Sequence, residues 1–259
     1  MAQAYSYLIH LQFLGFRYSG WQKQPRQKTV EGMLVKTMRF VLPGRQFKLL
    51  GAGRTDARVS ALQAAFELFL EGELHDPPGF LAEVNNNLPP DIRALDIRET
   101  DKGFNIINSC REKEYLYFFA FGQKIHPFCA PFMAGIPELL NIELMAETAL
   151  LYEGTHDFRA YTTRNGKQKQ YVRTITTCRI EKNELLKANF FPQTSYVLCV
   201  RGQGFMRYQV RMIMGALLGL GKGELSITDI RESLKPGNGI VLTYVAPGSG
   251  LLLHRLNFN

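Results

Sequence analysis

The chain has 259 residues, of which 46% are hydrophobic, and carries a formal net charge of +8 at pH 7. This length can bury one large core or two small ones, and the positive charge makes nucleic acid the first partner to consider. No apolar stretch approaches membrane-spanning length and no signal peptide is evident, so we expect a soluble cytoplasmic protein.

The first half of the sequence predicts six elements in the order β-α-β-β-α-β. Apolar and polar residues alternate over 5–13, which indicates a strand, and apolar residues recur at helical spacing from Val30 to Val41, before Pro43-Gly44. Between them lies a basic loop with the only tryptophan, Trp21. The other four elements are strands at 46–51 and 62–70, a helix at 78–87 and a strand at 92–97.

The second half repeats this order. A strand is predicted at 115–121 and a helix at 138–152, and Ser226-Ile227-Thr228-Asp229 fits the capping signature of a short helix. The other predicted elements are strands at 173–181, 195–201 and 251–258, and a helix at 205–220.

This element order predicts an α+β protein made of two ferredoxin-like halves. We expect the halves to share one antiparallel sheet with helices on one face. The first half, 1–103, carries the motif described next, and the second half, 104–259, completes a cleft for a large ligand.

The stretch Gly51-Ala52-Gly53-Arg54-Thr55-Asp56 lies on the predicted loop between two strands. Its glycines allow a turn and the close approach of another molecule, its guanidinium suits phosphate, and its carboxylate can act as nucleophile or base. A simple turn whose aspartate caps its own backbone is the structural alternative. A dinucleotide-binding fingerprint is rejected, because Asp56 stands where the third glycine is needed and no helix follows at once.

Metal chemistry finds no support in the sequence. The four cysteines form no Cys-x-x-Cys pair and no zinc spacing, and the five histidines are scattered, so we predict reduced structural cysteines and no metal site. Basic residues instead form three loose clusters, at Arg17, Lys23, Arg26 and Lys28, at Arg164, Lys167, Lys169 and Arg173, and at Arg201, Arg207 and Arg211.

The loop motif, with Gly20-Trp21-Gln22-x-Gln24 before it, resembles the TruA-type tRNA pseudouridine synthases. Further blocks match in the family's order over nearly the whole chain: Asn87-Leu88-Pro89, Ser109-x-x-x-Lys113-x-Tyr115-x-Tyr117, His156-Asp157-Phe158, Arg173-Thr174-Ile175, Val210-Arg211-x-Ile213-x-Gly215 and Ala246-Pro247-x-x-Gly250-Leu251. The number and order of these blocks make a chance match a poor explanation.

The resemblance implies isomerisation of specific tRNA uridines to pseudouridine, without metal or cofactor, by a homodimer in which each tRNA contacts both subunits. It makes Asp56 the catalytic aspartate, Arg54 its phosphate-binding or ion-pair neighbour, Tyr115 the active-site aromatic residue and Arg211 the second-half arginine near the cleft. The other residues predicted to bind substrate are Gly53, Thr55, Arg58, Trp21 and Leu251. A purely structural role is the alternative for Trp21.

The expected chemistry agrees with a single carboxylate. Cleavage of a uridine N-glycosidic bond builds oxocarbenium-like charge on the sugar, and Asp56 can attack the anomeric carbon or remove a neighbouring proton; both roles stay open. A conventional glycoside hydrolase needs a second, opposed carboxyl group, and the nearest acids, Glu67 and Glu71, lie on or beyond the next strand.

The target base must also leave its stem, and arginines with stacking aromatic rings suit that task. Arg54, Arg58 and Tyr115 are the candidates. The alternatives are a solvated loop charge for Arg58 and a core strand aromatic for Tyr115.

Three blocks depart from the family. Arg58-Val59-Ser60 stands in place of Gly-Val-His, Phe104-Asn105-Ile106-Ile107 lacks a basic residue, and residues 202–208 differ before the Val-Arg helix. The leading hypothesis is pseudouridine formation in the anticodon arm, where the family's targets are positions 38, 39 and 40. The alternatives are the same chemistry on another tRNA uridine or another RNA, and a non-catalytic RNA-binding protein.

Overall fold

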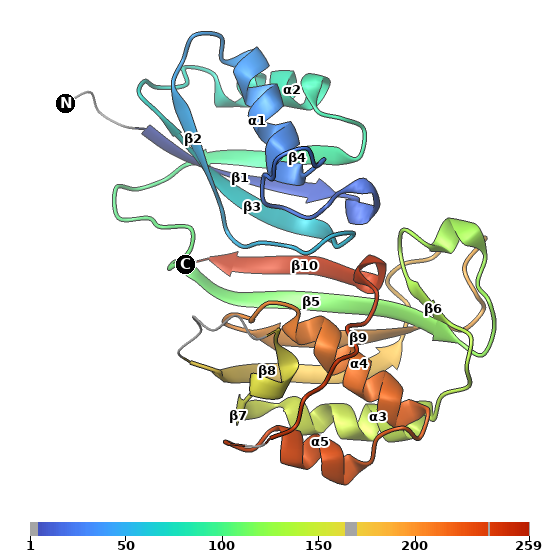
Figure 1. The fold of residues 1–259 in the computed structure, drawn as a ribbon. Coiled ribbons are helices and arrows are strands. Elements are labelled where there is room, and N and C mark those ends of the chain that lie inside the picture. The colour runs from blue at the N-terminus through green and yellow to red at the C-terminus, as the bar shows by residue number, and fades with distance from the viewer. Residues whose placement is uncertain (1–4, 164–169, 238, 259) are drawn as a thin grey trace. The chain divides into compact units, whose positions relative to one another are not determined.

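The protein divides into two compact units, Met1–Arg111 with Leu253–Asn259, and Glu112–Leu252. Its structure is a computed structural model that describes residues 5–163, 170–237 and 239–258. Both units combine helices with mostly antiparallel strands, so the predicted α+β class is confirmed. Figure 1 labels the elements of each unit.

The first unit has the predicted order β-α-β-β-α-β. Its elements are β1 (Tyr5–Phe13), α1 (Val30–Val41), β2 (Phe47–Gly51), β3 (Ser60–Leu70), α2 (Pro77–Asn87) and β4 (Ile92–Glu99). The strand β1 pairs antiparallel with both β3 and β4, and β2 pairs antiparallel with β3. The resulting order β4-β1-β3-β2 is that of a ferredoxin-like sheet, with α1 packed against α2 and α2 against β4 (Figure 1).

Local signals fix the ends of these two helices. The side chain of Thr29 accepts a hydrogen bond from the Gly32 amide at the start of α1, and Asp76 does the same for Gly79 at the start of α2. Each cap satisfies a backbone donor that the first helical turn leaves without an intrahelical partner. The buried face of α1, including Leu34 and Met38, joins a core formed by the inward side chains of β1 and β3.

The second unit contains the predicted elements and several more. Its elements are β5 (Cys110–Phe121, which begins in the first unit), β6 (Ala134–Ile136), α3 (Ile142–Ala149), β7 (Gly154–Asp157), β8 (Val172–Lys182), β9 (Tyr196–Gly202), α4 (Gln209–Gly221) and α5 (Ile227–Ser233). The last strand, β10 (Leu251–Phe258), begins here and continues in the first unit. The order β5-β9-β8-β7 is antiparallel throughout, and β6 lies parallel to β5 (Figure 1).

Two predicted helix starts were wrong, each for a local reason. The helix expected from 138 begins at Ile142, because the Asn141 side chain accepts from the Leu144 amide and caps it there. The helix expected from 205 begins at Gln209, because Tyr208 has a left-handed backbone with φ of 64°. The short strands β6 and β7 were missed. The capping box at Ser226 was confirmed.

Candidate functional site

The glycine-rich motif forms the loop between β2 and β3, and main-chain hydrogen bonds tie it to the segment before α1. The Trp21 amide donates to the Thr55 carbonyl at 3.0 Å, and the Arg58 amide donates to the Tyr18 carbonyl at 3.1 Å. Segments more than 30 residues apart in sequence are thereby held side by side. The loop has a fixed backbone, which a residue that performs chemistry requires.

Gly20 and Trp21 fit closely beneath this loop. Gly20 has φ of 105°, and a Cβ there would lie 2.7 Å from the Thr55 carbonyl oxygen, so the close approach requires glycine. The Trp21 side chain is only 5% exposed and lies against Gly51, where a Cβ would come within 2.6 Å of its Nε1. The indole therefore supports the loop from below, and any effect of Trp21 on substrate binding passes through the loop.

Asp56 is half-buried and begins a tight turn. Its carbonyl accepts from the Val59 amide at 3.2 Å. Arg54 and Arg58, two residues away on either side, are exposed. The loop thus presents one carboxylate between two cations, an arrangement that suits a reaction on a ribose flanked by phosphates.

Of the other two predicted loop residues, Gly53 is exposed and Thr55 is half-buried. The Thr55 hydroxyl is buried and has no hydrogen-bond partner within the described ranges. A buried hydroxyl in that state carries a desolvation cost without a compensating bond.

Glu67 does not provide a second catalytic carboxylate on the loop. It is 1% exposed in β3, opposite Leu50 of β2 and Leu8 of β1, and accepts from the Ile106 amide at 3.3 Å. Burial raises the pKa of its carboxyl group. Glu67 is therefore a buried carboxylate of the strand and does not act as a partner acid for Asp56.

The departures at positions 58 and 60 have clear structural settings. Arg58 has φ of 66°, a region where glycine is favoured, and its guanidinium lies 5.6 Å from the ring centre of Phe16. Ser60 is buried, and its hydroxyl accepts from the Gly15 amide at 2.9 Å. Arg58 therefore occupies an exposed position with a strained backbone, whereas Ser60 holds the end of the loop through its hydrogen bond with Gly15.

A second hydrogen-bond network holds Tyr18, whose carbonyl accepts the hydrogen bond from the Arg58 amide. The Tyr18 hydroxyl donates to Asp91 at 2.6 Å, and Arg17 donates to the same carboxylate at 2.8 Å. Burial opposes the charge on Asp91, but the bonds from Tyr18 and Arg17 outweigh it and lower the pKa of the Asp91 carboxyl. This buried carboxylate holds the segment to which the loop is bonded.

Asp91→Asn is expected to lower the free energy of unfolding by about 1–3 kcal/mol at neutral pH, since hydrogen bonds to a charged group are lost. The folded-state pKa lies below the unfolded value of about 3.9. The stabilisation is therefore present above about pH 4 and is lost as the pH falls through the folded-state pKa. Urea unfolding of both proteins across this range should show the difference shrinking at acid pH; a constant difference would contradict the assignment.

The second unit carries the other predicted site residues. Tyr115 lies on β5 opposite Val200 of β9, is half-buried, and makes an edge-to-face contact with Phe205 at 5.4 Å between ring centres. Leu251 is 6% exposed at the start of β10. It follows Gly250, where a Cβ would lie 2.6 Å from the ring of Tyr117, so Leu251 is set by a closely packed turn.

Arg211 lies in the first turn of α4 and is bonded to the segment before β10. Its Nε donates to the Ala246 carbonyl at 2.7 Å, and the Ala246 amide donates to the Arg211 carbonyl at 3.1 Å. Its guanidinium lies 5.1 Å from the ring centre of Tyr208. Sequence reasoning did not single out Tyr208; the signal was the spacing Arg207-Tyr208-x-x-Arg211, which puts a ring and two cations at one helix start.

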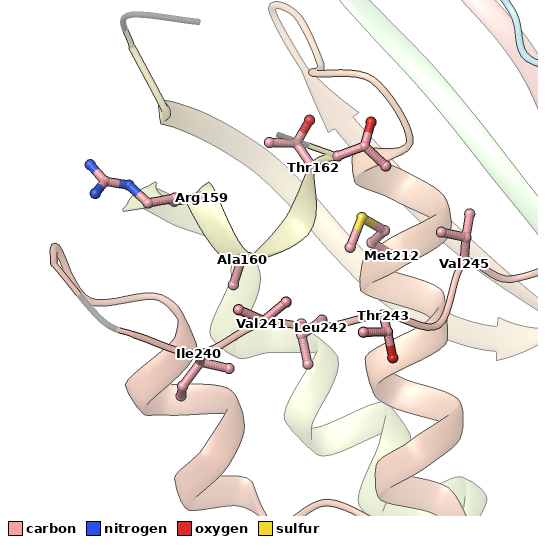
Figure 2. A pocket seen from close by; sticks show the side chains of 10 residues that line it. Arg159, Ala160, Thr162, Met212, Ile240, Val241, Leu242, Thr243 and Val245 are labelled. Carbon is pink, nitrogen blue, oxygen red and sulfur yellow. The ribbon is translucent and has the colours of Figure 1, made fainter. Parts of the chain in front are cut away.

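A cavity of about 370 Å³ borders α4, where it is lined by Met212, the residue after Arg211. Figure 2 shows its walls, which come from the short 3-10 helix Arg159–Tyr161, from α4 and from the chain before β10. The lining is mostly apolar: Arg159, Ala160, Thr162, Thr163, Met212, Ile240, Val241, Leu242, Thr243 and Val245. The Thr162 hydroxyl donates to the Arg207 carbonyl at 2.9 Å and so fixes the chain just before α4.

The predicted basic clusters are partly neutralised. Arg17 pairs with Asp91, and the Nε of Arg201 lies 2.7 Å from Glu114. Arg164, Lys167 and Lys169 lie outside the described residues. In the described ranges, no three His, Cys, Asp or Glu side chains are grouped to hold a metal ion. None of the helices described here is both long and apolar enough to cross a membrane.

Comparison with known proteins defines the class. A family profile described as tRNA pseudouridine synthase matches residues 148–259. The chain is 30% identical over 256 residues to tRNA pseudouridine synthase A of Thermodesulfovibrio yellowstonii, covering 95% of this chain and 96% of the relative. It is 29% identical to the Limosilactobacillus reuteri protein of that name, covering 98% and 97%, and 28% identical to tRNA pseudouridine synthase A 2 of Bacillus cereus, covering 98% and 100%.

These similarities make the protein an RNA-modifying isomerase that acts on uridine in tRNA. The chain belongs to the tRNA pseudouridine synthase A family.

Proposed function

We propose that this enzyme converts uridines 38, 39 and 40 of the tRNA anticodon arm to pseudouridine, with Asp56 as its catalytic aspartate. The observation that carries the proposal is the loop itself. Asp56 is half-buried on a backbone held by main-chain hydrogen bonds with Tyr18 and Trp21, with exposed arginines on either side. A fixed carboxylate among cations fits attack on a ribose within a phosphate chain.

The reaction begins with cleavage of the bond between uracil N1 and the sugar. Asp56 either attacks the anomeric carbon, with the bonding pair leaving on uracil, or removes a proton next to that carbon. The uracil is retained, turned and rejoined to the sugar through a ring carbon, and this step breaks the bond between Asp56 and the anomeric carbon or, in the second route, returns the proton that Asp56 removed. The ring carbon then loses its proton and N1 gains one, so the product is an isomer and no cofactor is consumed. In this proposal Arg54 and Arg58 contact phosphates, Tyr115 acts as the aromatic residue that stacks on a base, and Arg211 acts as a further basic residue.

We further propose that the enzyme acts as a cytoplasmic homodimer in which each tRNA contacts both subunits. The formal charge of +8 supports binding to a polyanion as large as tRNA. Sedimentation of the purified protein, alone and with tRNA, measures the subunit number.

The direct test is a pseudouridine map of RNA from cells with and without this protein. Loss of pseudouridine at positions 38, 39 and 40 alone supports the proposal. Loss at another tRNA uridine, or in another RNA, would keep the chemistry and replace the target. The exposed, strained Arg58 is the observation that favours this second outcome.

Arg58→Gly is expected to change the distribution of modified uridines more than the overall rate. The change removes a cation two residues from Asp56 and lets position 58 keep φ of 66° without a side chain. It should also raise the free energy of unfolding by about 1 kcal/mol, because a left-handed backbone costs an ordinary residue about that much. Arg58→Asn is the matched control, since asparagine tolerates this backbone. An unchanged modification map for Arg58→Gly would make Arg58 only a solvated charge.

A further inference from the structure

The side chain of Arg58 lies on an aromatic ring close to Asp56. Its Cζ is 5.6 Å from the ring centre of Phe16, which is half-buried in the short 3-10 helix Gly15–Arg17. A guanidinium at this distance is attracted by the negative face of the ring. Arg54 is also exposed, but it makes no ring contact within the described parts of the chain. The two arginines beside Asp56 are therefore held differently.

Hydrogen bonds on either side of Phe16 fix its place next to Arg58. The Gly15 amide donates to the Ser60 hydroxyl at 2.9 Å, and the Arg58 amide donates to the Tyr18 carbonyl at 3.1 Å. Phe16 lies between the two bonded residues of its own segment, and its bonded partners lie at and just after position 58. The ring is thus set against the end of the loop by the backbone and not only by its contact with the guanidinium.

The backbone of Arg58 would suit glycine better than arginine. Its φ of 66° is left-handed, a conformation that glycine adopts with less strain than any residue with a side chain. Strained backbones of this kind are held in place by their surroundings and cluster at functional sites. The backbone gives no reason for an arginine at this position, so we look for the reason in the guanidinium.

A guanidinium with one face against a ring keeps the donors along its edge for a ligand. These donors match a phosphate, which they can bind through two hydrogen bonds when the group has a defined direction. Position 58 is two residues from Asp56, so the two Cα atoms lie within about 7 Å of each other. A phosphate bound by Arg58 therefore belongs to the target nucleotide or to one beside it.

We propose that Phe16 is a positioning residue for Arg58, and that the two form a phosphate-binding subsite that sets which uridine of the RNA strand reaches Asp56. The proposal rests on the function proposed above. A fixed cation beside the catalytic carboxylate holds the strand in one register, whereas a mobile cation accepts neighbouring registers as well. Loss of the ring should therefore add modified positions, and only while Arg58 is present.

A double-mutant cycle tests this dependence. Phe16→Leu removes the ring and keeps an apolar side chain, and Arg58→Asn removes the guanidinium and tolerates the left-handed backbone. Both single variants and the double variant are measured on transcript tRNA for the positions of pseudouridine and for affinity at several salt concentrations.

Each variant has a defined expected result. Arg58→Asn should lower the salt slope on a log scale by about 0.7–0.9, the value of one phosphate contact. Phe16→Leu should weaken binding by about twofold to fivefold, the size of an exposed cation–ring contact, and should change the modification map in the same way as Arg58→Asn. In the Arg58→Asn background, Phe16→Leu should have no further effect. Phe16→Tyr, which keeps the ring, should behave like wild type.

Phe69→Leu is the matched control. The half-buried ring of Phe69 on β3 lies 5.8 Å from the Nζ of Lys48, the residue directly opposite it on β2. This variant loses a similar cation–ring contact away from the loop between the two strands. It should keep the wild-type affinity, salt slope and modification map.

The other results overturn the inference. An unchanged map and affinity in Phe16→Leu would leave Phe16 without a role in binding, and equal losses in both backgrounds would mean that it acts on the fold and not through Arg58. A Phe69→Leu variant with the same altered map would place the effect in the sheet. If Phe16→Leu fails to fold in thermal unfolding, Phe16→Met takes its place. A chain that binds tRNA but makes no pseudouridine refutes the proposed function, while the cycle is still read on affinity and salt slope.

Discussion

Asp56→Asn should abolish pseudouridine formation while leaving tRNA binding nearly intact. The two side chains have the same shape, but the amide is neither a nucleophile nor a base, so the loss falls on the chemical step. We expect the single-turnover rate with transcript tRNA to fall by more than about a thousandfold, and the affinity to change by no more than about threefold. Asp56 is half-buried, and main-chain bonds hold its loop. We therefore expect the loss of activity to come from the chemical step and not from misfolding.

Glu71→Gln is the matched control, because it removes an exposed carboxylate just after β3 without touching the loop. It should retain the wild-type rate, and both variants should unfold at the wild-type temperature. Substantial residual activity in Asp56→Asn would remove this residue from the catalytic role.

Gly20→Ala should disable the enzyme by displacing the loop from below. The new Cβ would lie 2.7 Å from the Thr55 carbonyl oxygen and 3.2 Å from the carbonyl carbon of Asp56, and both are backbone atoms that cannot turn aside. With φ of 105°, the residue is also strained in any case. We expect the free energy of unfolding to fall by about 2–4 kcal/mol and activity to fall at least about a hundredfold, since small displacements of reacting groups are costly.

Gly44→Ala separates the two causes. Gly44 also has a left-handed backbone, with φ of 74°, but a Cβ there would meet no atom within 4 Å. This variant should lose only about 1 kcal/mol of stability and keep its activity. Urea unfolding and single-turnover rates measure both effects. If the two variants behave alike, backbone strain and not contact with the loop determines the result.

The regular elements could be predicted because their signals are local. The helix α1 runs from Val30 to Val41 as its apolar spacing and the following Pro43-Gly44 indicated, and β10 matches its predicted bounds. The start of α4 could not be predicted, because the apolar pattern continues through residues 205–208 while the backbone of Tyr208 turns left-handed. Periodicity reports which face is buried, and not where the chain leaves the helix.

The site was predictable in its chemical groups but not in its supports. Arg54 and Asp56 stand out in the sequence because their side chains carry chemistry. The Arg58 amide donates to the Tyr18 carbonyl, and the Gly15 amide donates to the Ser60 hydroxyl, so each bond joins residues 40 or more apart through at least one backbone atom of a kind that almost every residue possesses. No residue pattern marks such contacts in a single sequence. Trp21 is the opposite case: the residue type suggested contact with substrate, but the side chain is buried and packs under the loop.

The way in which the loop is fastened also bears on how such an enzyme can diversify. Its two bonds to the segment before α1 run between main-chain atoms, so they persist when the side chains of the loop change. Arg54 and Arg58 point to solvent from this fixed backbone. Substitutions can therefore change the side chains around the carboxylate, as at position 58, while the backbone of the loop stays the same. After a gene duplication, a few such substitutions could direct one copy to a different uridine without a change of fold.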